Sequence, residues 1–334
     1  MSGLESKLFI PVGDAREREG VPVTVLVTGA AGFIGSTLVD RLLDSGERVI
    51  GVDSFTPYYD SAVKRNNLRA ALPNAAFTLW DRPLEALRET DLRDVRVIHH
   101  LAGQPGVRRS WGDEFAAYVR ANVTATQHLL ELASSAPRLE SIVYSSSSSI
   151  YGEAERHPTT EDVTPAPVSP YGVTKLTGEH LCAAYSGSRG LPITSLRYFT
   201  VYGPRQRPDM AFTRFLTAHA RGETLTVFGT GDQVRDFTYV DDIVRANLAA
   251  TAPHEGYRVY NVAGGSSASV AEVLTLIGRI SGRTPQVEYL PAAAGDVRRT
   301  GGATDRIRAE LFWAPSRDLD EGLTRQWEWI QTSR

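Results

Sequence analysis

The chain has 334 residues, of which 42% are hydrophobic and 22% charged, and its formal net charge is −3. This slight negative charge provides no global field for nucleic acid or an anionic membrane, and no apolar run approaches the roughly 20 residues that cross a bilayer. The first twenty residues carry no apolar signal-peptide core. We therefore expect a cytoplasmic globular protein, with one large core or two unequal ones and no nucleic-acid or membrane partner.

Cysteine and histidine usage argues against disulfide and metal chemistry. Cys182 is the only cysteine, and it falls on the apolar face of a predicted helix, as a small core residue does. The seven histidines include no His-x-x-x-His pair and have no companion cysteines. We therefore expect no metal site.

Strands and helices alternate along the first 200 residues. Residues 1–22 are expected to form a loose N-terminal extension. Short apolar segments bounded by turn residues predict strands, and apolar residues at helical spacing predict helices. The expected strands are 23–27, 48–53, 76–80, 95–101, 141–144 and 193–198, and the helices between them include 34–46, 122–134 and 171–185. Near-continuously apolar strands that alternate with helices predict an α/β fold, a Rossmann-type doubly wound parallel sheet.

The pattern changes after about residue 200, where a Pro-bracketed loop begins. The remaining expected helices are 210–221, 240–250 and 270–281, and the strands are 225–228, 257–262 and 286–290. We expect a smaller mixed α/β domain that caps the ligand-binding edge of the sheet. The expected division is 23–199 with 236–264 for the Rossmann domain, and 200–235 with 265–330 for the smaller one.

Three glycines follow the first expected strand and open a helix. At Gly29, Gly32 and Gly35 the absence of a side chain permits a tight turn, close approach of the backbone to a pyrophosphate, and close packing of helix on strand. Asp53 ends the second strand, where a carboxylate accepts hydrogen bonds from the adenosine ribose and repels a 2′-phosphate. Singly, such residues also occur in ordinary turns and helix caps; together they predict NAD as the cofactor, rather than NADP.

A run of five serines, 145–149, ends another strand, and Tyr171 and Lys175 follow on a predicted helix. Residues four apart share one helix face. A lysine ammonium beside a phenol favours the phenolate, so Tyr171 can act as a base nearer neutral pH than its free pKa of about 10 allows. A serine hydroxyl can then hold the substrate oxygen. Without the glycine motif, the same pair is more typical of an ordinary amphipathic helix.

Four segments together resemble the extended short-chain dehydrogenase/reductase superfamily, and within it the NAD-dependent epimerase/dehydratase family. They are Thr28-Gly-Ala-Ala-Gly-Phe-Ile-Gly35, the serine run with Tyr151-Gly152, Tyr171-x-x-x-Lys175, and Arg235-Asp-Phe-Thr-Tyr-Val-Asp-Asp242. The similarity extends from about residue 23 to 330. Segments 100–108, 145–152 and 199–210 further resemble the UDP-glucuronate 4-epimerases.

The resemblance assigns expected roles to individual residues. The implied catalytic residues are Ser147, Tyr171 and Lys175. The implied cofactor-binding residues are Gly29, Ala31, Gly32, Phe33, Ile34, Gly35, Asp53, Asp81, Leu101, Ala102, Gln104, Tyr171, Lys175 and Tyr198. The sequence around Asp81 departs from the Gly-Asp pattern usual in the family.

Two positions of the serine run bear on the reaction type. Related nucleotide-sugar dehydratases carry an Asp-Glu pair where this chain has Ser148 and Ser149, and related decarboxylases carry a Glu at the second position. Dehydration needs an acid–base pair, which two serines do not supply, whereas short neutral donors suit a bound carboxylate. The implied substrate-binding residues are Arg108, Ser148, Ser149, Thr200 and Arg207 for the sugar, Arg235 for the diphosphate and Asp296 for the uridine ribose. Each arginine is equally compatible with a structural ion pair.

We therefore expect an NAD-dependent 4-epimerase that interconverts UDP-glucuronate and UDP-galacturonate through a transient 4-keto intermediate. The alternatives are a UDP-glucose/UDP-galactose 4-epimerase, a UDP-glucuronate decarboxylase, and an NAD-sensing protein without catalysis. The resemblance also implies a homodimer formed by helices near residues 113–135 and 171–186.

Overall fold

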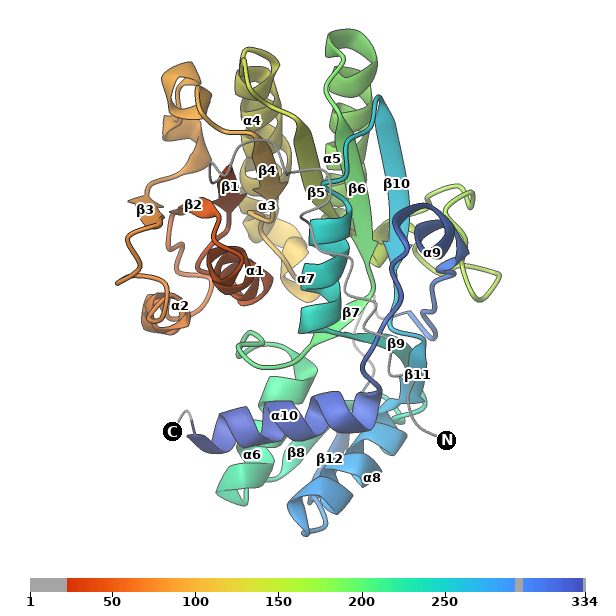
Figure 1. Cartoon of the computed structure of the whole chain (residues 1–334). Helices are drawn as coiled ribbons and strands as arrows, with labels where there is room; N and C mark the ends of the chain where they lie inside the picture. Colours follow the sequence, from red (N-terminus) through yellow and green to blue (C-terminus); the bar gives the residue numbers. More distant parts are fainter. Residues whose placement is uncertain (1–22, 292–296, 333–334) are drawn as a thin grey trace, which may run out of the picture.

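A seven-stranded parallel sheet forms the centre of the molecule (Figure 1), in a computed structural model that describes residues 23–291 and 297–332. The strand order is β10-β6-β5-β4-β1-β2-β3, and every adjacent pair is parallel. The strands are β1 Thr24–Thr28, β2 Arg48–Asp53, β3 Phe77–Asp81, β4 Val97–His100, β5 Ser141–Ser147, β6 Ile193–Tyr198 and β10 Tyr257–Val262. Chain order reverses direction between β1 and β4, so the predicted doubly wound sheet is confirmed.

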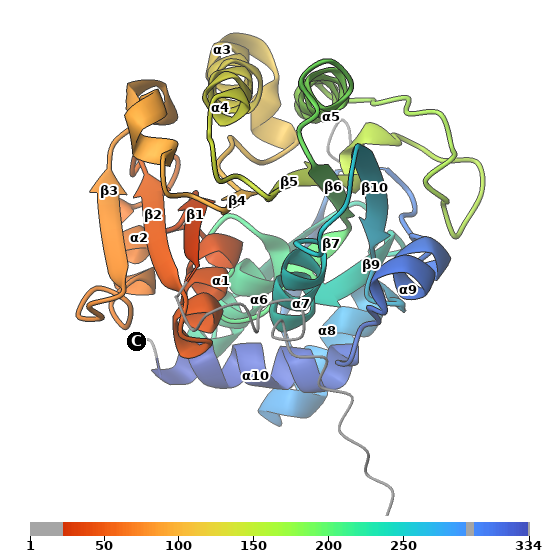
Figure 2. The ribbon, with the colours of Figure 1, turned by 45° about the horizontal axis from the view of Figure 1, so that its top comes forward.

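Helices cover both faces of this sheet, which explains why its strands are apolar on both sides. Figure 2 shows α3, α4 and α5 on one face and α1 and α7 on the other. The bounds are α1 Phe33–Asp44, α2 Ser61–Asn67, α3 Phe115–Tyr118, α4 Ala125–Ser134, α5 Pro170–Arg189 and α7 Val240–Ala249. Leu38 of α1 packs with Val25 and Val27 on one face, and Leu129 of α4 packs with the buried Cys182 on the other.

A second set of elements lies beneath the carboxyl ends of the strands (Figure 1). The strands β7 Thr200–Tyr202, β9 Val234–Tyr239 and β11 Ser266–Ser269 form a three-stranded sheet, and β8 Leu225–Phe228 pairs with β12 Val287–Leu290. The helices here are α6 Ala211–Arg221, α8 Val270–Ser281 and α10 Leu319–Thr332, while α9 Asp305–Leu311 lies beside β10. Because β9 pairs with β7 and β11, residues 236–239 lie outside the main sheet, although β10 returns to it. We propose the two-domain division expected from the sequence, except that residues 236–239 belong to the smaller domain.

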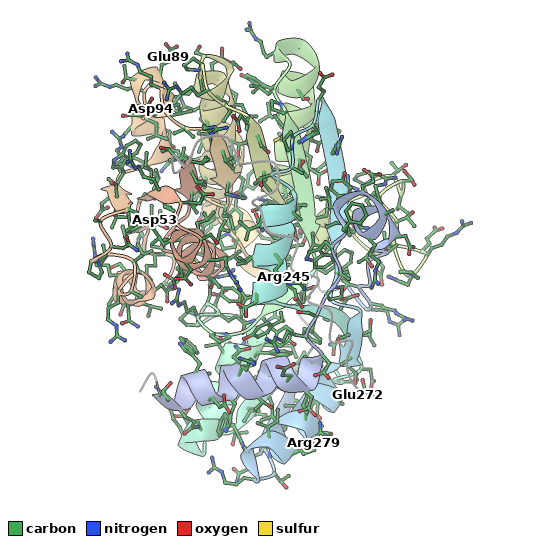
Figure 3. The ribbon with its side chains drawn as sticks, in the orientation of Figure 1. Asp53, Glu89, Asp94, Arg245, Glu272 and Arg279 are labelled. Atoms are coloured by element: carbon green, nitrogen blue, oxygen red, sulfur yellow. The ribbon has the colours of Figure 1, made fainter. Side chains whose placement is uncertain are left out.

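Local sequence signals account for several helix boundaries. The Ser169 side chain accepts a hydrogen bond from the Gly172 amide, and Pro170 occupies the first turn of α5. At α8, Ser269 and Glu272 form a reciprocal capping box; Figure 3 labels Glu272 at this helix start. Short 3₁₀ segments lie at 84–86, 89–92, 108–110, 112–114 and 148–150, and residues Val119–Thr124 form a π-helical turn between α3 and α4. No helix in the described part of the chain is long and apolar enough to span a membrane.

Candidate active site

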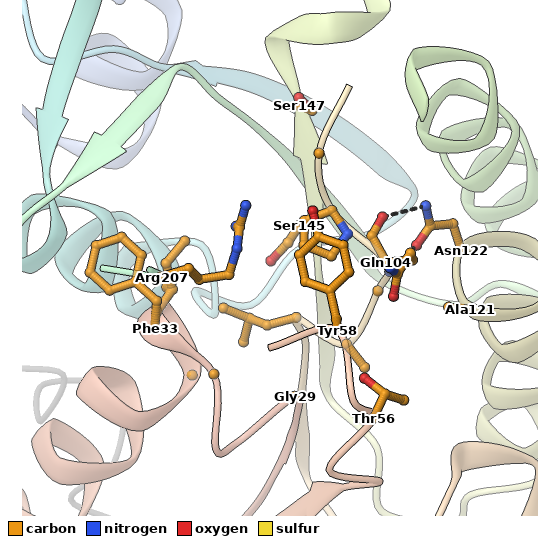
Figure 4. A pocket seen from close by; sticks show the side chains of 18 of the residues that line it. Gly29, Phe33, Thr56, Tyr58, Gln104, Ala121, Asn122, Ser145, Ser147 and Arg207 are labelled. Carbon is orange, nitrogen blue, oxygen red and sulfur yellow. Dashed lines mark hydrogen bonds between the residues drawn. The ribbon is translucent and has the colours of Figure 1, made fainter. Parts of the chain in front are cut away.

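A cavity of about 590 Å³ opens at the carboxyl ends of the central strands. Its wall comes from the ends of β1 to β6 and the segments that follow them, together with the start of α5 and the turn before α4. This is the point where the strand order reverses, which is where ligands bind in doubly wound sheets. The sequence-predicted residues that line it are Gly29, Gly32, Phe33, Ile34, Gly35, Asp53, Leu101, Ala102, Gln104, Ser147, Ser148, Ser149, Tyr171, Lys175, Tyr198, Thr200 and Arg207. Residues far apart in the sequence thus meet at a single site (Figure 4).

The glycine loop forms a cradle that side chains would fill. Gly29 has a φ of +68°, and a Cβ there would lie 2.8 Å from the Ala102 nitrogen. A Cβ on Gly35 would lie 2.1 Å from the Gly29 carbonyl oxygen. Gly32 is the N-cap of α1 and has no side chain to cap it. Phe33, Ile34 and Gly35 of the first turn line the cavity, so the positive end of the helix dipole lies at this site. This geometry fits the pyrophosphate of a dinucleotide.

The adenosine end of the cradle is organised by Asp53. Its carboxylate accepts hydrogen bonds from the amides of Ala31, at 3.1 Å, and Phe55, at 2.8 Å. The Ala31 amide is therefore engaged by Asp53, and Ala31 does not itself line the cavity. Lys64, which the motif reading did not identify, also lines the cavity, with its Nζ 3.9 Å from Asp53 Oδ1. Thr56 fixes that ammonium by accepting two hydrogen bonds from it.

Asp81, an expected cofactor contact, lies outside the lining of the cavity. Its side chain is half exposed and pairs with Arg65 at 2.9 Å, and it does not line the cavity. The next residues, Arg82 to Glu85, line this end of the cavity instead. The sequence also departs from the family pattern at this position.

Ser147, Tyr171 and Lys175 meet in the cavity as predicted. Ser147 lies at the carboxyl end of β5, and Tyr171 in the first turn of α5 shares a hydrogen bond with it. The Lys175 Nζ lies 4.6 Å from the centre of the Tyr144 ring, a cation–π contact beneath the cavity floor. The three side chains thus occupy positions from which a hydroxyl can be oriented and deprotonated.

Burial opposes the ionisation of both members of the Tyr-Lys pair. Burial raises the pKa of Tyr171, while the hydrogen bond with Ser147 and the charge of Arg207 lower it. Burial lowers the pKa of Lys175 to about 8. The sequence predicted a lowered tyrosine pKa through Lys175, but in the protein alone burial outweighs the groups that lower it. The positive charge of a bound nicotinamide would lower the pKa of Tyr171 further and so favour the phenolate.

A buried ion pair under the serine run holds these elements together. Arg197 of β6 donates to both oxygens of Glu179 on α5, from Nε to Oε1 at 3.0 Å and from Nη2 to Oε2 at 2.8 Å, and both side chains are almost fully buried. Ser146 of β5 donates to the same carboxylate, and Arg197 Nη1 donates to the Tyr151 hydroxyl at 2.7 Å. β5, β6 and α5 are therefore tied at one point, which fixes Ser147 against Tyr171.

Four of the seven predicted substrate-binding residues line the cavity. Ser148, Ser149, Thr200 and Arg207 line the same cavity as Tyr171. Arg108 instead stacks on Phe228, with its guanidinium carbon 4.4 Å from the ring centre, and Arg235 donates to the Val234 carbonyl. Neither lines the cavity within the residues that the structure describes. Asp296 lies outside the described residues.

Two further groups in the wall were not singled out from the sequence. Tyr58 and Tyr59, in the loop after β2, line the cavity. Asn122, in the π-helical turn, accepts from the Gln104 amide at 2.7 Å and donates to Gln104 O and Thr174 Oγ1, each at 3.0 Å (Figure 4). It thereby fixes the loop after β4 against α5, and π-turns are frequent at functional sites. The only sequence signal was the Tyr58-Tyr59 pair soon after Asp53.

A glycine-rich loop, an acid at the end of the second strand and a Ser-Tyr-Lys set line one cavity, as in NAD-binding enzymes of the extended short-chain dehydrogenase/reductase type. The model of the NAD dependent epimerase/dehydratase family matches residues 25–263, and the chain belongs to this family.

Curated relatives and a solved structure refine the comparison. The chain is 44% identical to an uncharacterized UDP-glucose epimerase, YtcB, of Bacillus subtilis, over 90% of this chain and 96% of the relative. It is 36% identical to a UDP-glucuronate 4-epimerase of Thermodesulfobacterium geofontis, over 91% of this chain and 95% of the relative. The crystal structure of the UDP-glucuronic acid 4-epimerase of Bacillus cereus, in complex with UDP-glucuronic acid and NAD, matches with a TM-score of 0.90 and 39% identity. That match covers 93% of this chain and 100% of the other.

Proposed function

We propose that the protein interconverts UDP-glucuronate and UDP-galacturonate, as an NAD-dependent 4-epimerase. The observation that carries this proposal is a set of neutral donors and one arginine in the same cavity as the catalytic residues, which we call the carboxylate wall: Ser148, Ser149, Thr200 and Arg207. None of the four is an acid that could perform dehydration, and all four can donate to a sugar carboxylate. The names of the T. geofontis and B. cereus proteins support the same substrate.

The residues of the chain account for proton transfer at C4 of the sugar. In its phenolate form Tyr171 accepts the proton of the C4 hydroxyl, while Ser147 orients that oxygen. Bound NAD⁺ supplies the hydride acceptor at C4 and, in its reduced form, the hydride donor for the opposite face. Between these two steps the 4-keto sugar turns over within the cavity. Tyr171 then returns the proton to the C4 oxygen, so that protons and electrons balance over the cycle.

The carboxylate wall addresses a side reaction of this chemistry. A 4-keto sugar with a carboxylate on C5 is a β-keto acid, which loses CO₂ readily. Hydrogen bonds from Arg207 and the serines stabilise the anionic carboxylate, and its charge must leave these donors if the C–C bond breaks. Firm binding therefore disfavours decarboxylation and favours epimerisation.

A proton NMR time course with UDP-glucuronate tests the proposal. We expect signals of UDP-galacturonate to grow until an equilibrium mixture is reached. A UDP-pentose product would contradict the protective role of the carboxylate wall. Conversion of UDP-glucose with no change in UDP-glucuronate would contradict the substrate assignment.

The second candidate is a UDP-glucose 4-epimerase, which the name of the B. subtilis relative favours. In that case Arg207 would serve the loop before α6 and not a substrate carboxylate. Parallel kcat/KM values for the two sugars discriminate the candidates. An NAD sensor without catalysis would bind NAD and turn over neither sugar.

The exposed face of the helix layer supports a dimer. On this side Trp111, Phe115 of α3 and Val173 of α5 are 51%, 39% and 46% exposed. We propose a cytoplasmic homodimer in which α4 and α5 of one copy pack on those of the other. Light scattering after size exclusion is expected to give twice the 36.5 kDa chain mass, and a Val173→Glu variant is expected to shift toward the monomer.

A further inference from the structure

The cavity arginine already holds a carboxylate of the chain itself. Arg207 donates from Nε to Asp209 Oδ1 at 3.0 Å and from Nη2 to Oδ2 at 2.9 Å. This two-pronged geometry is typical of strong arginine–carboxylate pairs. The side chain of Arg207 is 18% exposed and that of Asp209 is 38% exposed. The arginine is thus embedded in the wall, and the aspartate is the more accessible partner.

Asp209 stands at the rim of the cavity, next to its lining. Tyr58 and Arg207 line the cavity and Asp209 does not, yet the Tyr58 hydroxyl donates to Asp209 Oδ2 at 3.5 Å. The Arg207 guanidinium carbon also lies 5.8 Å from the centre of the Tyr58 ring. Figure 4 shows Arg207 and Tyr58 among the side chains that surround the cavity. Asp209 therefore lies directly beside the guanidinium that would bind a ligand carboxylate.

We propose that Asp209 is an internal carboxylate that competes with the sugar carboxylate for Arg207, and thereby sets how strongly the cavity prefers an acidic sugar over a neutral one. The inference rests on the proposed function, in which Arg207 binds the sugar carboxylate. The Nη1 group of Arg207 makes no hydrogen bond to another described residue, so one edge of the guanidinium is open. A sugar carboxylate either binds that edge beside Asp209 or displaces Asp209 from the other edge.

In both binding modes Asp209 weakens the binding of the acidic sugar. Beside Asp209, the incoming carboxylate meets a like charge at short range, which costs Coulomb energy. In displacement, the bidentate pair between Arg207 and Asp209 must be broken first. A sugar with a neutral C6 hydroxymethyl group meets neither cost. The charge of Asp209 therefore weakens binding of the acidic sugar selectively.

The test compares the affinity of NAD-loaded protein for UDP-glucuronate and for UDP-glucose by calorimetry. A Tyr171→Phe background prevents turnover, so that each titration reports a single epimer. In this background Asp209→Asn and Asp209→Ala both remove the charge, and Asn keeps the size and one acceptor. The matched control is Asp162→Asn, since Asp162 also pairs with an arginine, Arg306 at 2.7 Å, but this arginine, unlike Arg207, does not line the cavity.

We expect both Asp209 variants to raise the preference for UDP-glucuronate over UDP-glucose by about two- to fivefold, the range for a partly exposed ion pair. The control is expected to leave the ratio unchanged. An unchanged or lowered ratio in both Asp209 variants would overturn the inference, because it would mean that Asp209 orients Arg207 and does not compete for it. Failure of the otherwise wild-type enzyme to epimerise UDP-glucuronate would overturn the proposed function instead.

Discussion

Replacing Arg207 by Met removes the one cation from the proposed carboxylate wall and keeps a side chain of similar length. A charge-assisted hydrogen bond contributes about 1.5–3 kcal/mol, and each 1.4 kcal/mol is a tenfold change in affinity. The Arg207 side chain is 18% exposed and shares its charge with Asp209, so the lower end of that range applies. We expect UDP-glucuronate to bind roughly tenfold more weakly and UDP-glucose by less than about twofold.

The same variant is expected to change the products. With a weaker hold on the carboxylate, the 4-keto intermediate loses CO₂ more often, so the NMR time course should show UDP-pentose beside UDP-galacturonate. The matched control is Arg205→Met, because Arg205 lies on the same loop, pairs with Asp40 at 2.7 Å and does not line the cavity. Unchanged affinity and an unchanged product ratio in Arg207→Met would refute the reasoning.

Four further changes test other parts of the account. Tyr171→Phe is expected to lower kcat by about 10²–10⁴ while the protein keeps its NAD, and turnover at the wild-type rate would exclude Tyr171 as the base. Gly35→Ala is expected to abolish NAD retention, measured from the cofactor released on denaturation, because its Cβ would lie 2.1 Å from the Gly29 carbonyl oxygen. Arg197→Met is expected to cost about 3–5 kcal/mol in the free energy of unfolding, because it leaves the Glu179 carboxylate buried without its partner; denaturant titration measures this, and a loss under about 1 kcal/mol contradicts it. Lys175→Met is expected to raise the melting temperature at pH 7, since burial lowers the pKa of Lys175 to about 8 in the folded protein from 10.5. The unfolded state binds more protons between these two pKa values, so the stability of the wild type increases as pH rises through them. The difference in melting temperature between the variant and the wild type should therefore disappear above about pH 10. A difference that does not depend on pH would contradict the buried charge.

The sheet and the catalytic residues were predictable because each depends on local pattern. The apolar segments 48–53, 193–198 and 257–262 became β2, β6 and β10 with the predicted bounds, since a strand buried on both faces has little sequence freedom. Ser147, Tyr171 and Lys175 meet as predicted, because parallel strands end at one edge and residues four apart share a helix face.

The contacts that the sequence did not indicate depend on how loops return to the cavity. Asp81 pairs with Arg65, and Lys64 lies beside Asp53 at a position that no motif spacing indicates. The role of Asn122 arises from a π-helical turn that the expected regular helix at 122–134 did not contain. Arg207 and Asp209 are only two residues apart in the sequence. Their place at the cavity is nevertheless visible only in the structure, where Tyr58 of another loop contacts both.

The most direct measurement of the central claim uses UDP-glucuronate carrying deuterium at C4. If C4 is oxidised and reduced within one binding event, the UDP-galacturonate formed keeps the deuterium at C4, in ordinary water and without added NADH. The account predicts nearly complete retention together with inversion at C4. Loss of the label to solvent, or a product whose configuration is unchanged at C4, would contradict it.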